Sequence, residues 1–172
     1  ALRDCTRIAI DLDLPIEIVV GVCAGLSPNN KWPRNIANTR DLCTAFVNGD
    51  GIDSVKVSTY HKMKEKAWSI LCDMLDHDGI IDRLNGQKIV SFYRNIMGDD
   101  TCTIDGHARN IAYNERVGLT DDKTNIGVKE YRTLQAEYVA AAKRTRVNGR
   151  ALKAFELQAI TWVTWRRIHN IK

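Results

Sequence analysis

Lys88 and Asp105 are the two side chains whose types and spacing best suit chemistry on a sugar carbon, and they lie 17 positions apart. Lys88 follows a short turn that contains Gly86, and Asp105 opens an acid–Gly–His triplet. An amine can attack a sugar carbon and form a Schiff base, and a carboxylate can stabilise the positive charge that develops there. Because both residues are expected at the starts of successive helices, we predict that they meet at the rim of one cleft.

Each of these residues also has an interpretation without chemistry. An Asp at a helix start usually serves only as an N-cap, because its carboxylate accepts hydrogen bonds from backbone N–H groups there. A lysine after a turn often contacts phosphate or solvent. Attack by Lys88 requires a neutral amine, which burial favours. The residues alone leave the nucleophile and bystander roles of Lys88 equally open.

The turn before Lys88 suggests a phosphate site. Backbone N–H groups of a tight glycine turn, backed by a helix N-terminus, bind phosphate without reading base sequence. We expect Asn85, Gly86 and Gln87 to make these contacts, with Arg83 adding positive charge. A plain connection between two helices explains the same residues equally well.

Two other segments contain candidate DNA contacts. Asn30 and Trp32 lie in a loop bracketed by prolines, where a side chain could fill the gap left by a flipped base. Trp32 is equally well explained as the first core residue of the next helix. His107 is expected to order the loop near Asp105, and Arg109, about one turn further on, to pair with Asp105 or with a phosphate.

The elements that must position these residues are helices, because the apolar periodicity is helical along nearly the whole chain. We predict an all-α fold in a single domain, residues 1–172. The expected helices cover residues 2–9, 15–26, 33–46, 59–75, 80–84, 87–97, 105–113, 127–146 and 150–170, with a short extended piece at 52–57. Ser58 or Thr59 is the expected cap of the fourth helix, and Asp78-Gly79 is an expected break.

Charge and cysteine usage narrow the class of protein. The formal net charge of +4 is compatible with a nucleic-acid partner without establishing one. The five cysteines contain no C-x-x-C pair, and we expect neither a metal nor a cofactor. Their odd number and wide spacing favour reduced, mostly buried thiols in an intracellular protein. Cys72 is expected on an apolar helix face. No apolar run reaches the length of a membrane span, and the first residues lack a signal-peptide pattern, so no membrane partner is expected.

Two basic clusters remain without an assigned role. The run from Tyr60 to Lys66 is the densest, and such runs usually form a solvated helix face. Lys143, Arg144, Arg146 and Arg150 form a second cluster at an expected corner between two helices. Contact with phosphates and simple solubility both explain this second cluster.

A resemblance follows from the segment 84–109. Leu84-Asn85-Gly86-Gln87-Lys88-Ile89 and Ile104-Asp105-Gly106-His107-Ala108-Arg109 resemble the hairpin and the following helix start of the helix-hairpin-helix DNA glycosylases, of the endonuclease III type. The hairpin here is shorter, with one glycine instead of two, and the Lys-to-Asp spacing is one residue shorter. The similarity covers residues 15–115. The segment from Gln158 to Arg167 also resembles small phage-encoded proteins.

The resemblance implies a two-lobed helical fold and a DNA glycosylase, with or without lyase activity, that excises a damaged or modified base by flipping it out. It implies Asp105 and Lys88 as catalytic residues and the 84–88 hairpin as the anchor on double-stranded DNA. We expect a monomer. A non-catalytic or base-modifying DNA-binding module on the same scaffold is the alternative, and a helical protein-interaction domain is the third.

Overall fold

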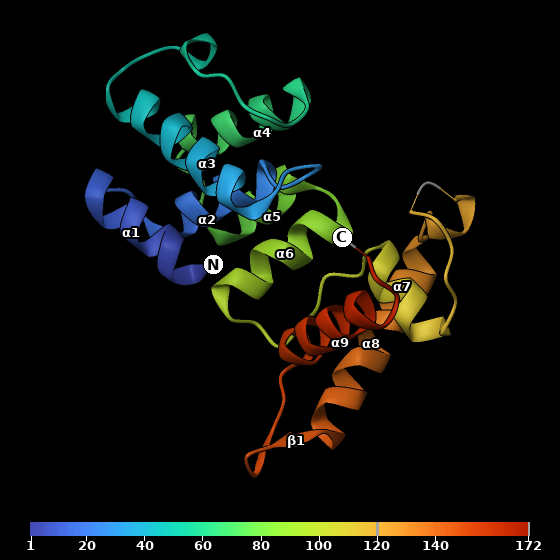
Figure 1. The fold of residues 1–172 in the computed structure, drawn as a ribbon. Coiled ribbons are helices and arrows are strands. Elements are labelled where there is room, and N and C mark those ends of the chain that lie inside the picture. Colours follow the sequence, from blue (N-terminus) through green and yellow to red (C-terminus); the bar gives the residue numbers. More distant parts are fainter. Residues whose placement is uncertain (120, 172) are drawn as a thin grey trace. The chain divides into compact units, whose positions relative to one another are not determined.

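The computed structural model describes residues 1–119 and 121–171 (Figure 1). Nine α-helices, two short 3₁₀ turns and one two-stranded hairpin make up the regular structure of these residues, which confirms the all-α prediction. The chain divides into two compact units, Ala1–Met97 and Gly98–Lys172. In the described residues no helix is both long enough and apolar enough to cross a bilayer.

The first unit is built around one apolar helix. Its elements are α1 (Leu2–Leu12), α2 (Ile16–Gly25), α3 (Trp32–Val47), the 3₁₀ turn η1 (Ile52–Ser54), α4 (His61–Cys72), α5 (His77–Leu84) and α6 (Gln87–Met97). Helix α2 is buried almost all round and packs against α1, α3, α4, α5 and α6 (Figure 1). Gly21 allows the close approach of α5, because a Cβ there would lie 2.9 Å from Cγ2 of Ile80.

The second unit has its own smaller core. Its elements are α7 (Gly106–Tyr113), the 3₁₀ turn η2 (Asp122–Thr124), α8 (Val128–Arg144), β1 (Arg146–Val147), β2 (Arg150–Ala151) and α9 (Ala154–Ile168). Two tyrosines of α8 connect this core to the polar backbone of its neighbours. The hydroxyl of Tyr131 accepts a hydrogen bond from the N–H of Ile104, and the hydroxyl of Tyr138 donates to the carbonyl of Ala108.

Two predicted helix starts in the first unit are wrong, and α4 ends at Cys72 instead of Leu75. Helix α4 begins at His61, because Thr59 uses its hydroxyl to reach the carbonyl of Pro28 and does not cap the helix. Helix α5 begins at His77 and not at residue 80. The carboxylate of Asp76 accepts a hydrogen bond from the N–H of Gly79, which makes this glycine part of the first turn instead of a break.

The expected extended piece at 52–57 is also wrong in part, because residues 52–54 form a 3₁₀ turn. A further error lies between the last two helices, because α8 ends two residues earlier and α9 begins four residues later than predicted. Strands β1 and β2 pair there, with Asn148 at φ 51° and Gly149 at φ 78° in the turn. An Asn-Gly pair in left-handed backbone is the favoured two-residue connection of a β-hairpin.

Four cysteines are buried and Cys72 is exposed, which contradicts the predicted burial of Cys72. The reason is that α4 ends at Cys72, where the apolar face of the helix stops. Burial raises the pKa of Cys43 and Cys102 to about 12, so both thiols stay protonated at neutral pH. These two side chains therefore pack as small apolar groups.

Candidate nucleic-acid interface

The connection between α5 and α6 is a two-residue turn, as predicted. Asn85 takes a left-handed conformation with φ 38°, and its N–H donates to the carbonyl of Ile81. The carbonyl of Gly86 accepts a hydrogen bond from the N–H of Val90, so α6 starts directly after the turn. A Cβ at Gly86 would meet no atom closer than 3.9 Å. Packing in the fold therefore does not require a glycine there, and the backbone is open to a ligand.

A groove of about 590 Å³ lies beside this turn. Its lining includes Lys62 and Lys66 from α4 and Asp82, Arg83 and Asn85 from α5 and the turn. Because Arg83 is itself paired with Asp73, the two lysines against the one lining carboxylate make the groove attractive to an anion. We call this surface the α4–α5 groove.

Lys66 connects the groove to the turn. Its ammonium donates a hydrogen bond to the carbonyl of Leu84, the last residue of α5. Partial burial, and then the charge of nearby Lys62, lower the pKa of the Lys66 amine. A bound anion would oppose the second effect, because a negative charge favours the protonated amine. Arg83 is held at the other side of the groove by an ion pair with Asp73, at 2.8 Å.

The basic run from Tyr60 to Lys66 is therefore only partly a solvated face. Lys64 is 7% exposed, and Lys66 is half-buried against the end of α5. The sequence signal for the groove was the spacing of Lys62 and Lys66, which are four residues apart and so share one helix face. The spacing alone does not indicate a groove, because the packing of this face against the end of α5 is a tertiary contact.

Lys88 is exposed at the second position of α6. No described residue forms an ion pair with it. The burial that a lysine nucleophile requires is not provided by the first unit. Lys88 and Asp105 belong to different units, and their convergence stays a prediction.

Asp105 caps α7 as predicted. Its Oδ1 accepts a hydrogen bond from the N–H of Ala108 at 2.8 Å, and the residue is half-buried. Among the described residues, Oδ1 is the atom of this carboxylate that accepts a hydrogen bond.

Arg109 is committed to the interior of the second unit. Its guanidinium pairs with Glu115 at 3.1 Å and Glu130 at 3.6 Å, and it lies over the ring of Tyr113. The predicted pairing with Asp105 is replaced by these two carboxylates. With 11% of its side chain exposed and its charge balanced, Arg109 has no geometric support as a phosphate contact.

His107 packs by its ring edge against Trp162 of α9, with ring centroids 6.3 Å apart. Its Nδ1 is buried and has no hydrogen-bond partner among the described residues. The imidazole therefore joins α7 to α9, and its expected role in ordering the loop near Asp105 stays a prediction. Its contact with DNA stays a prediction.

Asn30 and Trp32 are held by contacts within the first unit. The amide of Asn30 donates to the carbonyl of Leu26 and to Oδ1 of Asn38, both at 3.3 Å. The indole N–H of Trp32 donates to Asp4 at 3.3 Å, and its ring meets Phe92 edge-on. These contacts explain both residues by packing. Insertion of either one into DNA stays a prediction that would require the contacts to break.

Comparison with known proteins gives one match, to a protein family. Neither the curated proteins nor the solved structures contain a match to the chain. A family model, described as a family of unknown function (DUF7178), matches residues 1–169. This match covers both compact units, and the chain therefore belongs to the DUF7178 family.

Proposed function

We propose that this protein binds duplex DNA through the 85–87 turn and the α4–α5 groove and removes a base from it, with Asp105 as the carboxylate that acts on the sugar. The observation that carries the binding step is the contact between Lys66 and the end of α5, which holds an ammonium beside an open glycine turn. Lysines and turn N–H groups contact DNA phosphates without reading the base sequence.

The proposed chemistry assigns Asp105 to the sugar. A flipped base leaves the sugar through an oxocarbenium-like state, and the departing base carries away the electron pair of the broken N-glycosidic bond. The carboxylate of Asp105 would stabilise the positive sugar, and a water would then add its oxygen to C1′ and release a proton. The capping bond from Ala108 would fix the orientation of the carboxylate during these steps.

Lys88 has two possible roles within this proposal. As a nucleophile its amine would bond to C1′ while the base leaves, and the resulting Schiff base would lead to strand cleavage by elimination. As a phosphate contact it would only strengthen binding. Its exposure at the start of α6 favours the second role.

The alternative is a DNA-binding module without base removal. The observation that favours it is that Asp105 is explained by capping and Lys88 by solvent. It predicts duplex binding that weakens with salt, with no product from any modified base. A helical protein-interaction domain, the third candidate, predicts no duplex affinity at low salt.

The test of base removal compares the substitution of Asp105, which caps α7, with the substitution of a second helix-capping aspartate. Asn caps a helix about as well as Asp, so Asp105→Asn removes the charge and keeps α7. The matched control is Asp76→Asn, because Asp76 caps α5 in the same way, at 2.9 Å from the N–H of Gly79. We expect the unmodified chain to release a base from at least one duplex of a panel of damaged and hypermodified bases.

Asp105→Asn is expected to lower that release by two orders of magnitude or more, on the order of what one electrostatic group contributes at a reacting centre. Asp76→Asn is expected to leave it unchanged. Undiminished release by Asp105→Asn contradicts the assigned role of this residue. Binding without product across the whole panel favours the module without base removal.

A further inference from the structure

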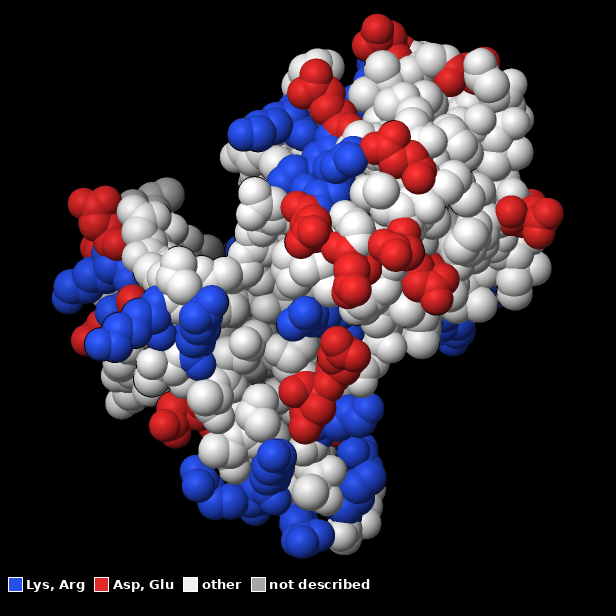
Figure 2. Space-filling model, turned by 180° about the vertical axis from the view of Figure 1, so that it is seen from behind, with Lys and Arg blue, Asp and Glu red and all other residues white. Residues whose placement is uncertain are grey.

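The segment 143–153 contains five Lys or Arg residues and no Asp or Glu. It forms the end of α8, both strands of the β-hairpin and the residue before α9. In Figure 2, Lys and Arg side chains gather around this hairpin, which lies at the bottom of the view. We call residues 143–151 the basic arm. The chemistry of base removal gives it no role.

The arm has a fixed shape. Arg146 pairs with Ala151 and Val147 with Arg150, and the N–H of Leu152 extends the pairing to the carbonyl of Thr145 at 3.1 Å. Leu152 itself is buried in the core of the second unit. A fixed shape matters because side chains presented on a rigid element lose less conformational entropy when they bind.

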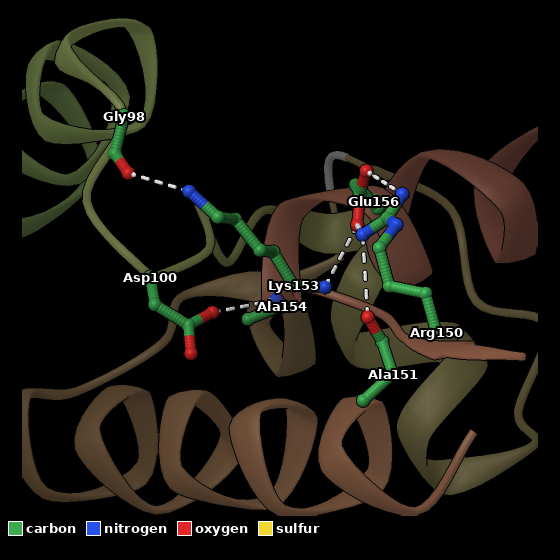
Figure 3. Close-up of polar contacts among 7 residues, drawn as sticks. All are labelled: Gly98, Asp100, Arg150, Ala151, Lys153, Ala154 and Glu156. Atoms are coloured by element: carbon green, nitrogen blue, oxygen red, sulfur yellow. Dashed lines mark hydrogen bonds and ion pairs between the residues drawn. The ribbon is translucent and has the colours of Figure 1, made fainter. Parts of the chain in front are cut away.

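Two of the five cations brace the arm (Figure 3). Arg150 forms two hydrogen bonds of 2.8 Å with Glu156, and this carboxylate also accepts from the N–H of Lys153. The ammonium of Lys153 reaches the carbonyl of Gly98. At the start of α9, the N–H of Ala154 donates to Asp100. Arg150 and Lys153 are therefore explained by the fold.

The other three cations, Lys143, Arg144 and Arg146, are exposed and have no carboxylate partner among the described residues. Cations in the last turn of a helix are favoured by its dipole, which explains Lys143 and Arg144. Arg146 lies beyond the helix end, so this explanation does not reach it. Its guanidinium donates a hydrogen bond to the carbonyl of Gly149 within the hairpin.

We propose that the basic arm is a second contact with duplex DNA, in which Lys143, Arg144 and Arg146 lie against backbone phosphates. This inference rests on the proposed function, since it takes the same partner. Charge complementarity selects the occupant: three cations without a carboxylate partner, two in the last turn of α8 and one on the adjoining strand β1, match the regular negative charge of a duplex backbone. The arm would add affinity without adding base specificity.

The test is the salt dependence of duplex binding by the full chain. The arm variant carries Lys143→Gln, Arg144→Gln and Arg146→Gln. The control variant carries Lys123→Gln, Lys129→Gln and Arg132→Gln, which removes the same charge from exposed positions of the same unit. The slope of log K against log salt is negative, and each lost phosphate contact reduces its magnitude by about 0.9. We therefore expect the arm variant to reduce this magnitude by roughly 2–3 and the control variant by less than 1.

Equal slopes for the two variants overturn the inference and leave the proposed function standing. Absence of duplex binding by the unaltered chain overturns both. Anionic phospholipid vesicles are tested in parallel, and vesicle binding that depends on the arm, with an unchanged DNA slope, overturns the inference in favour of a membrane surface. Thermal unfolding checks the fold. If the triple variant is unfolded, Arg146→Gln alone decides, with an expected slope change of about 0.9.

Discussion

At the scale of single residues, attraction of an anion depends on which cations are unpaired and which already have a carboxylate partner. Lys62 lines the α4–α5 groove and is exposed, whereas Arg109 and Arg150 have carboxylate partners. All three residues are Lys or Arg, so residue type alone does not tell an unpaired cation from a paired one. Position separates them, because an arginine whose guanidinium is already paired with a carboxylate has less attraction left for a phosphate.

Lys62→Gln is expected to weaken duplex binding and to lower the salt slope by about 0.9, since one phosphate contact is lost. Stability is expected to change by less than about 0.5 kcal/mol, because Lys62 is an exposed surface side chain. Fluorescence anisotropy of a labelled duplex at several salt concentrations measures the slope. Lys56→Gln, an exposed position of the same unit outside the groove, is the matched control. A slope that changes equally in both variants contradicts the role of the groove.

Lys88 is expected to contact a phosphate and not to form a Schiff base, because its amine is exposed to water. Borohydride reduction in the presence of abasic duplex is then expected to trap no covalent complex, while Lys88→Gln weakens binding. A trapped complex that disappears in Lys88→Gln would establish the nucleophile role and contradict this expectation.

At the scale of elements, caps and turns decided where sequence-based prediction succeeded. The start of α7 at Asp105 and the turn at Asn85-Gly86 were predicted correctly, because each has a strong local signal. The start of α5 was missed because Gly79 resembles a break until Asp76 is seen to cap its N–H. The β-hairpin was missed because Asn148-Gly149 also suits a helix-to-helix corner, and only tertiary packing chooses between the two.

The ion pair between Arg150 and Glu156 predicts how the stability of the protein changes as the pH falls. Arg150, followed by the backbone N–H of Lys153, lowers the pKa of Glu156 to about 2. A carboxyl group with a depressed pKa in the folded state stabilises the protein above its unfolded value of 4.5, and this contribution is lost as the pH falls toward 2. Glu156→Gln removes it at every pH.

We therefore expect the unaltered chain to be more stable than Glu156→Gln at pH 7 and the difference to vanish near pH 2. Urea unfolding at a series of pH values measures this difference. Glu137→Gln is the control, because Glu137 is exposed and outside any ion pair of the described residues. A difference that stays constant from pH 7 to pH 2 would show that the Arg150–Glu156 pair does not stabilise the fold.

At the scale of the whole molecule, the helical class was predictable because apolar periodicity reports helix faces directly. The division into two units was not, since no composition change marks the boundary after Met97. The candidate site was predictable only in parts. The turn and the cap are local features, whereas the α4–α5 groove arises from two helices that meet in space. The convergence of Lys88 and Asp105, which belong to different compact units, stays a prediction.

The central claim is that the chain binds the backbone of duplex DNA, and the most direct measurement is the affinity of the full chain for a labelled duplex across salt concentrations. If the 85–87 turn, the groove and the basic arm contact several phosphates, log K falls linearly with log salt with a slope of about −4 or steeper. Absence of binding at low salt, or an affinity that does not change with salt, would contradict the account.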